Sequence, residues 1–316
     1  MKPTLPGIHH VTALTADAQK NIDFYTGVLG LRMIKVTVNF DDPTTYHLYY
    51  GDESGRPGSA MTFFAWPGAR RGRVGPPQVT VTGFAVPAAA LDYWRERLKE
   101  RGVNGLTEED RFDDKVLSFR DPDDMRLEIV ATREPGGDAP AGGPIPPDFA
   151  IRGFHGVTIA ELGPDPTIAL LSGVMGFREE ATDNGRTRYR AEGGSPYASA
   201  VDIVKVSTES RGFNGAGTVH HVAFRVPDDA QQTAWQSEIG QRGLAVSPVM
   251  NRCYFHSIYF REPGGVLFEI ATDGPGFTLD ESPESLGQAL QLPPWMESDR
   301  AELEKVLPPL RLPDWR

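Results

Sequence analysis

Cysteine, long apolar runs and excess positive charge are all scarce in this chain of 316 residues. The single cysteine, Cys253, excludes an internal disulfide and favours a reducing compartment, so we expect a cytoplasmic protein. No apolar run approaches the ~20 residues that a membrane-spanning helix needs, and residues 1–6 lack the apolar segment of a signal peptide. The net charge of −11 argues against nucleic acid or an anionic membrane as a partner.

Two short stretches with adjacent histidines stand out, residues 7–12 (GIHHVT) and residues 218–223 (TVHHVA). Each is typical of a β-strand, because β-branched and apolar residues surround the histidine pair. Successive side chains of a strand point to opposite faces, so only one histidine of each pair is expected to face a given site.

The neighbours of each histidine indicate which one faces inward. His220 shares its face with an apolar series that is typical of a buried layer, Val222, Phe224 and Val226. His221 shares its face with Ala223 and Arg225, a smaller and more polar surface that could line a cavity. We therefore predict that His10 and His221 face inward, with His9 and His220 behind or beside them.

The chain repeats a pattern of one strand, one helix and several further strands four times. Residues 7–12 align with residues 153–158 and, at the same offset, residues 24–32 align with residues 170–178. The last two segments are typical of an amphipathic helix that ends at a glycine-rich turn. The four units run over roughly residues 5–67, 78–132, 151–207 and 217–272.

A linker divides the four units into two similar halves. Proline and glycine make up 9 of the 15 residues 134–148, a composition typical of a connection between domains. We predict domains over residues 1–133 and 151–272, a linker over residues 134–150, and a proline-rich tail over residues 273–316. The tail is expected to cover some part of the protein and to contain one helical stretch, residues 301–307.

Glu269 lies inside an otherwise apolar stretch, residues 266–271 (VLFEIA). A carboxylate in such a strand is unfavourable unless it is paired or binds a metal. Glu128 occupies the equivalent place in the second unit, so the plain alternative is a repeat that keeps a glutamate paired to an arginine.

Comparison of the units favours a metal site. The positions equivalent to His10 are Val81, Gly156 and His221, and only the fourth unit combines a histidine with the strand glutamate, Glu269. A site built from His10, His221 and Glu269 requires the first and fourth units to pair across the linker. Two imidazoles and one carboxylate leave coordination positions open, as in non-haem Fe(II) oxygenases. An isolated histidine in a β-strand more often packs or forms a hydrogen bond than binds a metal. Two histidines at equivalent places of the repeat, together with an aligned glutamate, favour metal binding instead.

These residues resemble those of the vicinal oxygen chelate superfamily, which includes glyoxalases, bleomycin resistance proteins and extradiol dioxygenases. The resemblance implies an α+β fold of four βαβββ modules in two tandem glyoxalase-like domains, with mixed sheets that form cup-shaped half-barrels around a divalent metal. Within the superfamily the chain is similar to ring-cleaving dioxygenases of the hydroquinone 1,2-dioxygenase type. The matching segments span nearly the whole chain: residues 9–10, 46–50, 220–221, 251–252, 264–269 and 276–278.

The resemblance implies an Fe(II)-dependent extradiol dioxygenase, with Mn(II) as the alternative metal. Its substrates would be O2 and a small aromatic diol of the hydroquinone or catechol type. In that subgroup the second histidine of each pair and the strand glutamate bind iron, which again selects His10, His221 and Glu269. The sequence is compatible with a homo-oligomer but does not specify one.

The resemblance also suggests catalytic residues beside the metal. Tyr259 lies ten positions before Glu269 and would hydrogen-bond a substrate oxygen, whereas its repeat equivalent is Ser118. The alternative is that Tyr259 is an ordinary aromatic residue of a β-strand, without a catalytic role. Arg252 would stabilise an anionic substrate or intermediate, although its equivalent, Arg111, leaves a structural ion pair open.

The other histidines are assigned further roles. His220 and His9 would orient the metal ligands or shuttle a proton, with packed and hydrogen-bonded histidines as the alternative. The other histidines have no partners that suggest a metal site, and we interpret them as structural, with His256 as the best exception because it lies near Tyr259: His47, His155 and His256.

Other functions remain open within the same superfamily. A lyase or isomerase of the glyoxalase I type would use a fourth protein ligand from residues 59–65, but this stretch contains no Glu, Gln or His. Three ligands suit an oxygenase, or a thiol transferase of the fosfomycin-resistance type, better than a glyoxalase. A non-enzymatic drug-binding protein would lack the metal triad altogether.

Overall fold

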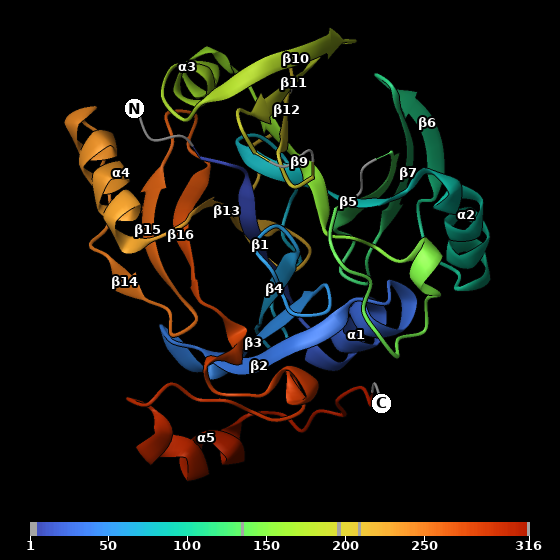
Figure 1. The fold of residues 1–316 in the computed structure, drawn as a ribbon, viewed down its shortest axis with the longest axis vertical. Coiled ribbons are helices and arrows are strands. Elements are labelled where there is room, and N and C mark those ends of the chain that lie inside the picture. Colours follow the sequence, from blue (N-terminus) through green and yellow to red (C-terminus); the bar gives the residue numbers. More distant parts are fainter. Residues whose placement is uncertain (1–4, 134–135, 195–196, 208–209, 315–316) are drawn as a thin grey trace.

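The computed structural model describes residues 5–133, 136–194, 197–207 and 210–314. These residues form two eight-stranded mixed β-sheets, each curled into a half-barrel with helices on its outer side (Figure 1). The predicted α+β fold with cup-shaped half-barrels is confirmed.

The first sheet is built from the first and fourth repeat units. Its strands, in spatial order, are β14 (Met250–Asn251), β15 (Phe255–Arg261), β16 (Leu267–Pro275), β13 (Val219–Val226), β1 (Ile8–Thr15), β4 (Ala60–Ala65), β3 (Asp42–Gly51) and β2 (Arg32–Asn39). The two units meet where β1 pairs antiparallel with β13.

The second sheet is built from the second and third units in the same way. Its strands, in spatial order, are β10 (Phe177–Asp183), β11 (Arg186–Ala191), β12 (Ala200–Lys205), β9 (Phe154–Glu161), β5 (Gln78–Pro87), β8 (Arg126–Thr132), β7 (Asp114–Arg120) and β6 (Thr107–Arg111). The predicted pairing of the first and fourth units across the linker is therefore confirmed. Each sheet draws on both halves of the sequence, and the domain boundaries at residues 133 and 151 stay a prediction.

Each repeat unit places one helix after its first strand. The helices are α1 (Ala18–Ile22, continued by one π-helical turn, Asp23–Val28), α2 (Leu91–Glu100), α3 (Asp165–Gly173) and α4 (Asp229–Gln241). Asp17 and Asp228 cap α1 and α4, because each carboxylate accepts a hydrogen bond from a backbone N–H in the first turn. Trp94 and Trp235, at equivalent places in α2 and α4, are fully buried against the sheets.

β-Bulges interrupt the central strand pair of each sheet at matching places. His9 is the extra residue on β1 and His220 the extra residue on β13, since the register shifts there by one. In the second sheet the extra residues are His155 on β9 and Thr80 on β5. The bulges belong to the scaffold as a whole, because the second sheet keeps them without twin histidines.

The C-terminal tail lies beneath β2 and β3 (Figure 1). Leu290 forms a parallel bridge with Val36 on the edge strand β2, and the fully buried Lys35 on the same strand pairs with Asp280 (2.6 Å) and Glu281 of the tail. The predicted helical stretch is α5 (Arg300–Val306). The tail therefore covers an edge strand whose free backbone groups would otherwise be open to pairing.

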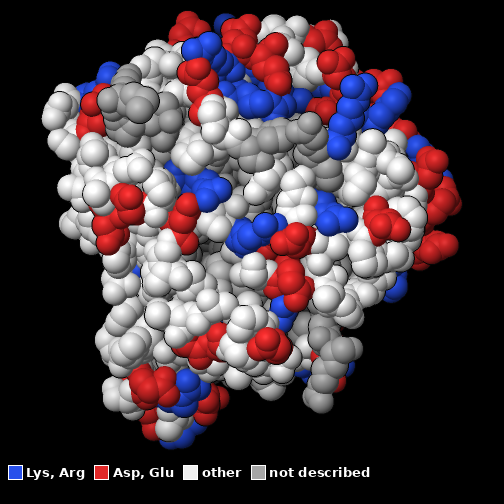
Figure 2. All heavy atoms as spheres, in the orientation of Figure 1, with Lys and Arg blue, Asp and Glu red and all other residues white. Residues whose placement is uncertain are grey.

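The surface seen in Figure 2 mixes charges of both signs, with Lys and Arg gathered near the top of the view and Asp and Glu among them. None of the helices formed by the described residues has the length and apolar character needed to cross a lipid bilayer.

Candidate metal centre

His10, His221 and Glu269 converge from three adjacent strands, β1, β13 and β16. Glu269 Oε2 lies 2.9 Å from His221 Nε2 and 3.3 Å from His10 Nε2, and the two Nε2 atoms lie 3.4 Å apart. All three residues are buried. The structure thus brings together the three residues predicted to bind a metal.

The surroundings of Glu269 fit a cation. Its Oε1 atom accepts a hydrogen bond from Ser257 Oγ, whereas Oε2 accepts none of standard geometry from the described residues. Its ion-pair partners among those residues are the two histidines, and no Lys or Arg reaches it. A fully buried carboxylate oxygen that faces two imidazole nitrogens in this way lacks a positive partner, which a divalent metal would supply.

The electrostatics favour the ligand form of each group. Burial raises the pKa of Glu269, but the adjacent imidazoles of His10 and His221 outweigh burial and hold this pKa well below its usual range. Burial lowers the pKa of His221, and this favours a neutral imidazole with a free lone pair.

Each inner histidine contacts the histidine before it. His9 Nδ1 lies 2.9 Å from His10 Nδ1, and His220 Nδ1 lies 2.8 Å from His221 Nδ1. Side chains of adjacent residues in a regular strand point apart, but His9 and His220 are the bulge residues, and the bulges allow the rings to meet. The first histidines therefore lie beside the ligands, where they can fix ring orientation and tautomer.

The expectation that only one histidine of each pair faces the site is wrong for the second pair. His220 and His221 both line a cavity of about 400 Å³ in front of the candidate metal ligands, because the bulge interrupts the alternation of side chains. His220 is half-buried rather than part of an apolar layer, and burial lowers its pKa to about 3. His10 lines the same cavity, whereas His9 lines a separate one of about 180 Å³.

Tyr259 and Arg252 both line the 400 Å³ cavity. Tyr259 lies opposite Glu269 in the β15–β16 register, and its hydroxyl accepts a hydrogen bond from Arg252 Nε at 3.2 Å. Arg252 also pairs with Asp41 at 3.0 Å, across from the first unit. Burial raises the pKa of Tyr259, so the phenol stays protonated. Arg252 thus bridges the two units over the cavity.

Several residues that line the cavity were not predicted from the sequence to do so. His47 was interpreted as structural, but it lines the cavity together with Thr12 and Tyr49. The repeat could have found Tyr49, because it pairs with Thr62 on β4 as Tyr259 pairs with Glu269 on β16. The rest of the wall is largely aromatic, with Phe40, Phe64, Trp66 and Phe255.

His256, the exception suggested for the other histidines, lies outside this cavity. Its Nδ1 atom hydrogen-bonds to Asp229 on α4 at 2.6 Å. Proximity to Tyr259 in sequence did not bring it to the site, because alternate residues of β15 face opposite sides of the sheet.

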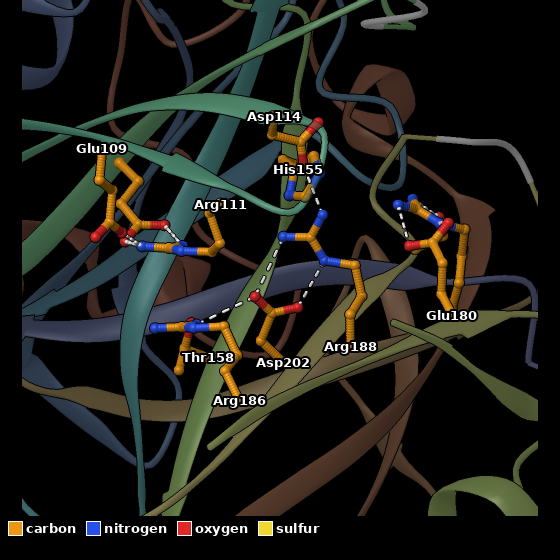
Figure 3. A network of polar contacts seen from close by, with 12 residues as sticks. Glu109, Arg111, Asp114, His155, Thr158, Glu180, Arg186, Arg188 and Asp202 are labelled. Carbon is orange, nitrogen blue, oxygen red and sulfur yellow. Dashed lines mark hydrogen bonds and ion pairs between the residues drawn. The ribbon is translucent and has the colours of Figure 1, made fainter. Parts of the chain in front are cut away.

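The equivalent place in the second half-barrel is filled by arginines. Arg111 makes two hydrogen bonds of 2.7 Å to Glu128, the counterpart of Glu269. Arg188 lies between Asp202 and Asp114, at 2.8 and 2.5 Å, beside His155 (Figure 3). The cavity left there is only about 10 Å³. The buried carboxylates at this place, Glu128 and Asp202, therefore already have cationic partners.

The chain is similar to a known protein family, to named proteins and to solved structures. The description "Glyoxalase/Bleomycin resistance protein/Dioxygenase superfamily" matches residues 7–129 and 157–270. A protein of Bacillus subtilis (strain 168) named "Putative ring-cleaving dioxygenase MhqO" is 46% identical over 97% of this chain and 97% of its own length. Chlorohydroquinone/hydroquinone 1,2-dioxygenase of Sphingobium indicum is 35% identical over 95% of each chain.

A crystal structure of a "putative dioxygenase" from Bacillus subtilis superposes with a TM-score of 0.93, at 44% identity, and covers 99% of this chain and 100% of that one. The names of these relatives agree with the predicted enzyme class, a ring-cleaving dioxygenase that incorporates O2. The matches extend over both halves of the sequence, so the chain belongs to the glyoxalase/bleomycin resistance protein/dioxygenase superfamily.

Proposed function

We propose that the protein is an Fe(II)-dependent extradiol dioxygenase that opens the ring of a hydroquinone- or catechol-type diol. The observation that carries this proposal is the convergence of His10, His221 and Glu269 at one end of an aromatic cavity. Three protein ligands on one face would leave coordination positions for both the diol and O2. Bound there, Fe(II) would supply the redox chemistry, and both oxygen atoms would enter the product without an external reductant.

The residues around the triad suit the proton and charge movements of this reaction. His220 lines the cavity, where its imidazole is placed to accept a proton from a substrate hydroxyl. Tyr259 and Arg252 can hydrogen-bond a substrate oxygen and stabilise negative charge that develops on it. His9 contacts His10 and lines a separate cavity, so its role would be to orient that ligand.

A four-ligand lyase of the glyoxalase I type is less well supported. Thr62 occupies the place in the first unit that Glu269 occupies in the fourth, and its hydroxyl hydrogen-bonds to Thr12 and His47. A threonine hydroxyl engaged in this way is a poor fourth ligand.

The proposal is tested with protein loaded anaerobically with Fe(II) or Mn(II). Addition of air-saturated buffer and a hydroquinone should consume one O2 per diol and give a coloured ring-opened acid that carries both atoms of isotopically labelled O2. Metal analysis of the purified protein separates the alternatives. Absence of bound metal would favour the drug-binding alternative, and a full complement of metal without O2 uptake on a broad panel of diols would refute the dioxygenase.

A further inference from the structure

A chain of hydrogen-bonded side chains crosses the wall of the 400 Å³ cavity from β1 to β3. Thr12 Oγ1 lies 2.8 Å from Thr62 Oγ1, which lies 2.9 Å from His47 Nε2, and His47 Nδ1 lies 2.9 Å from the Tyr49 hydroxyl. The His47 ring also packs on Tyr49 and Phe64, with centroids 4.1 and 4.4 Å apart. Packing and hydrogen bonds therefore fix this chain before any ligand binds.

This wall is the counterpart of the wall that carries the candidate metal ligand Glu269. Tyr49 lies opposite Thr62 between β3 and β4, as Tyr259 lies opposite Glu269 between β15 and β16. The cavity is thus lined by two related tyrosines, one beside a carboxylate and one beside a threonine. In the sheet order, Tyr49 lies on β3, two strands beyond His10 on β1 and away from Glu269 on β16.

The residue two positions before each tyrosine hydrogen-bonds to the residue that lies opposite that tyrosine on the neighbouring strand. His47 hydrogen-bonds to Thr62, as Ser257 hydrogen-bonds to Glu269. Burial holds the pKa of His47 well below its usual range, so its ring is neutral, with one donor and one acceptor nitrogen. In either tautomer the Tyr49 hydroxyl has hydrogen-bonding capacity left after its bond to His47.

The two carboxylates that line the cavity are already engaged. Asp41 pairs with Arg252, and Asp42 accepts a hydrogen bond from the Trp66 indole at 2.7 Å. Tyr49 offers a further polar contact, on β3, within a largely aromatic wall.

We propose that Tyr49, positioned by His47 and Thr62, binds the second hydroxyl of a para-diol and makes hydroquinones preferred over catechols. This inference rests on the proposed function. A catechol can direct both of its adjacent oxygens to one metal, whereas a hydroquinone can direct only one, so its second hydroxyl must lie across the cavity. A hydroxyl buried there without a partner would be unfavourable, and the Tyr49 hydroxyl provides the partner.

The test measures equilibrium binding rather than turnover. Calorimetric titration of the Fe(II)-loaded protein without O2 gives dissociation constants for hydroquinone, phenol and catechol. Tyr49→Phe should weaken hydroquinone binding about tenfold and change phenol and catechol by less than about twofold, because only hydroquinone loses a hydrogen bond. His47→Ala should weaken hydroquinone in the same direction, and His47→Gln should restore part of the loss. In turnover, KM for hydroquinone should rise while kcat stays constant.

Tyr50→Phe is the matched control. Tyr50 follows on the same strand, is fully buried, and hydrogen-bonds to Asn21 on the other side of the sheet. This substitution should leave all three affinities unchanged. Equal weakening of all three ligands in Tyr49→Phe, or no weakening of hydroquinone, would overturn the inference. Wild-type protein that binds diols but consumes no O2 would refute the dioxygenase instead, and the affinities would still decide the role of Tyr49.

Discussion

The half-barrel of β1–β4 and β13–β16 and the half-barrel of β5–β12 place a buried glutamate at the same point and neutralise it differently. Glu269 faces two imidazoles in front of a cavity of about 400 Å³. Glu128 is held by Arg111, and the space left is about 10 Å³. In the second half, an arginine side chain both neutralises the glutamate and fills the interior of the half-barrel. In the first half, two imidazoles leave the negative charge of the glutamate without a cationic side chain among the described residues and leave open space in front of it, which would suit a metal and a substrate.

The backbone is not what separates the two halves. Both central strand pairs carry two bulges, and His155 in the second half is the counterpart of His9 in the first. The difference lies in the side chains at the metal positions, where Val81 and Gly156 stand in place of His221 and His10. The same scaffold therefore supports a structural ion pair in one half and a candidate metal centre in the other.

The largest effect is expected from substitution of the ligands themselves. His221→Ala or Glu269→Gln should abolish stoichiometric metal binding and lower kcat/KM at least ~1000-fold, because the proposed metal would carry the chemistry. Metal analysis and O2 uptake check both effects. Glu128→Gln, at the equivalent place in the other half, should retain metal and activity, and loss of metal in that variant would contradict the division between the halves.

The ion pair of the second half should be most sensitive to removal of its cation. Arg111→Met leaves Glu128 buried and unpaired, so the free energy of unfolding should fall by about 3–5 kcal/mol, as measured by urea denaturation. The double variant Arg111→Met/Glu128→Leu should regain most of this loss, because neither charge of the Arg111–Glu128 pair remains. A double variant as unstable as the single one would mean that packing, rather than charge, governs this site.

An effect of intermediate size on kcat is expected from substitution of Tyr259, compared with its counterpart Ser118. Tyr259→Phe removes the hydroxyl that Arg252 contacts and should lower kcat about 100-fold while metal content stays constant. Ser118→Ala, at the matching place in the second half, should leave kcat unchanged. Steady-state O2 uptake measures both, and equal effects of the two substitutions would remove the catalytic role of Tyr259.

The smallest effect concerns stability in acid. Burial alone would raise the pKa of Asp114, but His155 and Arg188 lower it to about 2, below its unfolded value of 3.8. A lowered folded pKa contributes stability above about pH 4, and this contribution is lost as the pH falls toward 2. Asp114→Asn should therefore cost about 2 kcal/mol at pH 6 and almost nothing at pH 2. A pH-independent difference between the two proteins in urea denaturation would contradict this origin.

Much of the fold could be predicted because it is a repeat. The alignment of residues 7–12 with residues 153–158 is local in sequence, and so is the buried-strand pattern around Glu269. The pairing of the first and fourth units followed from a chemical requirement, since His10 and His221 could share a metal only if their strands were neighbours. The sheet order confirms that pairing.

The bulges could not be predicted from the histidines. Strict alternation along a strand placed His220 in an apolar layer, but the register shift on β13 brings it to the cavity. A bulge is a property of two paired strands, so it cannot be predicted from the sequence of one strand alone. His47 was missed for a related reason, because its partner Thr62 lies on β4 and its ring faces a space that both sequence halves enclose.

Sequence alone determined the number of modules, the residue types able to hold a metal, and the contrast between His221 and Val81, since these are properties of single strands and of their repetition. Tertiary structure decided which walls face each other, that Arg252 spans the cavity to reach Asp41, and that the tail covers β2. Those outcomes depend on contacts between residues more than 200 positions apart, and the relative placement of such residues is set only when the sheets close.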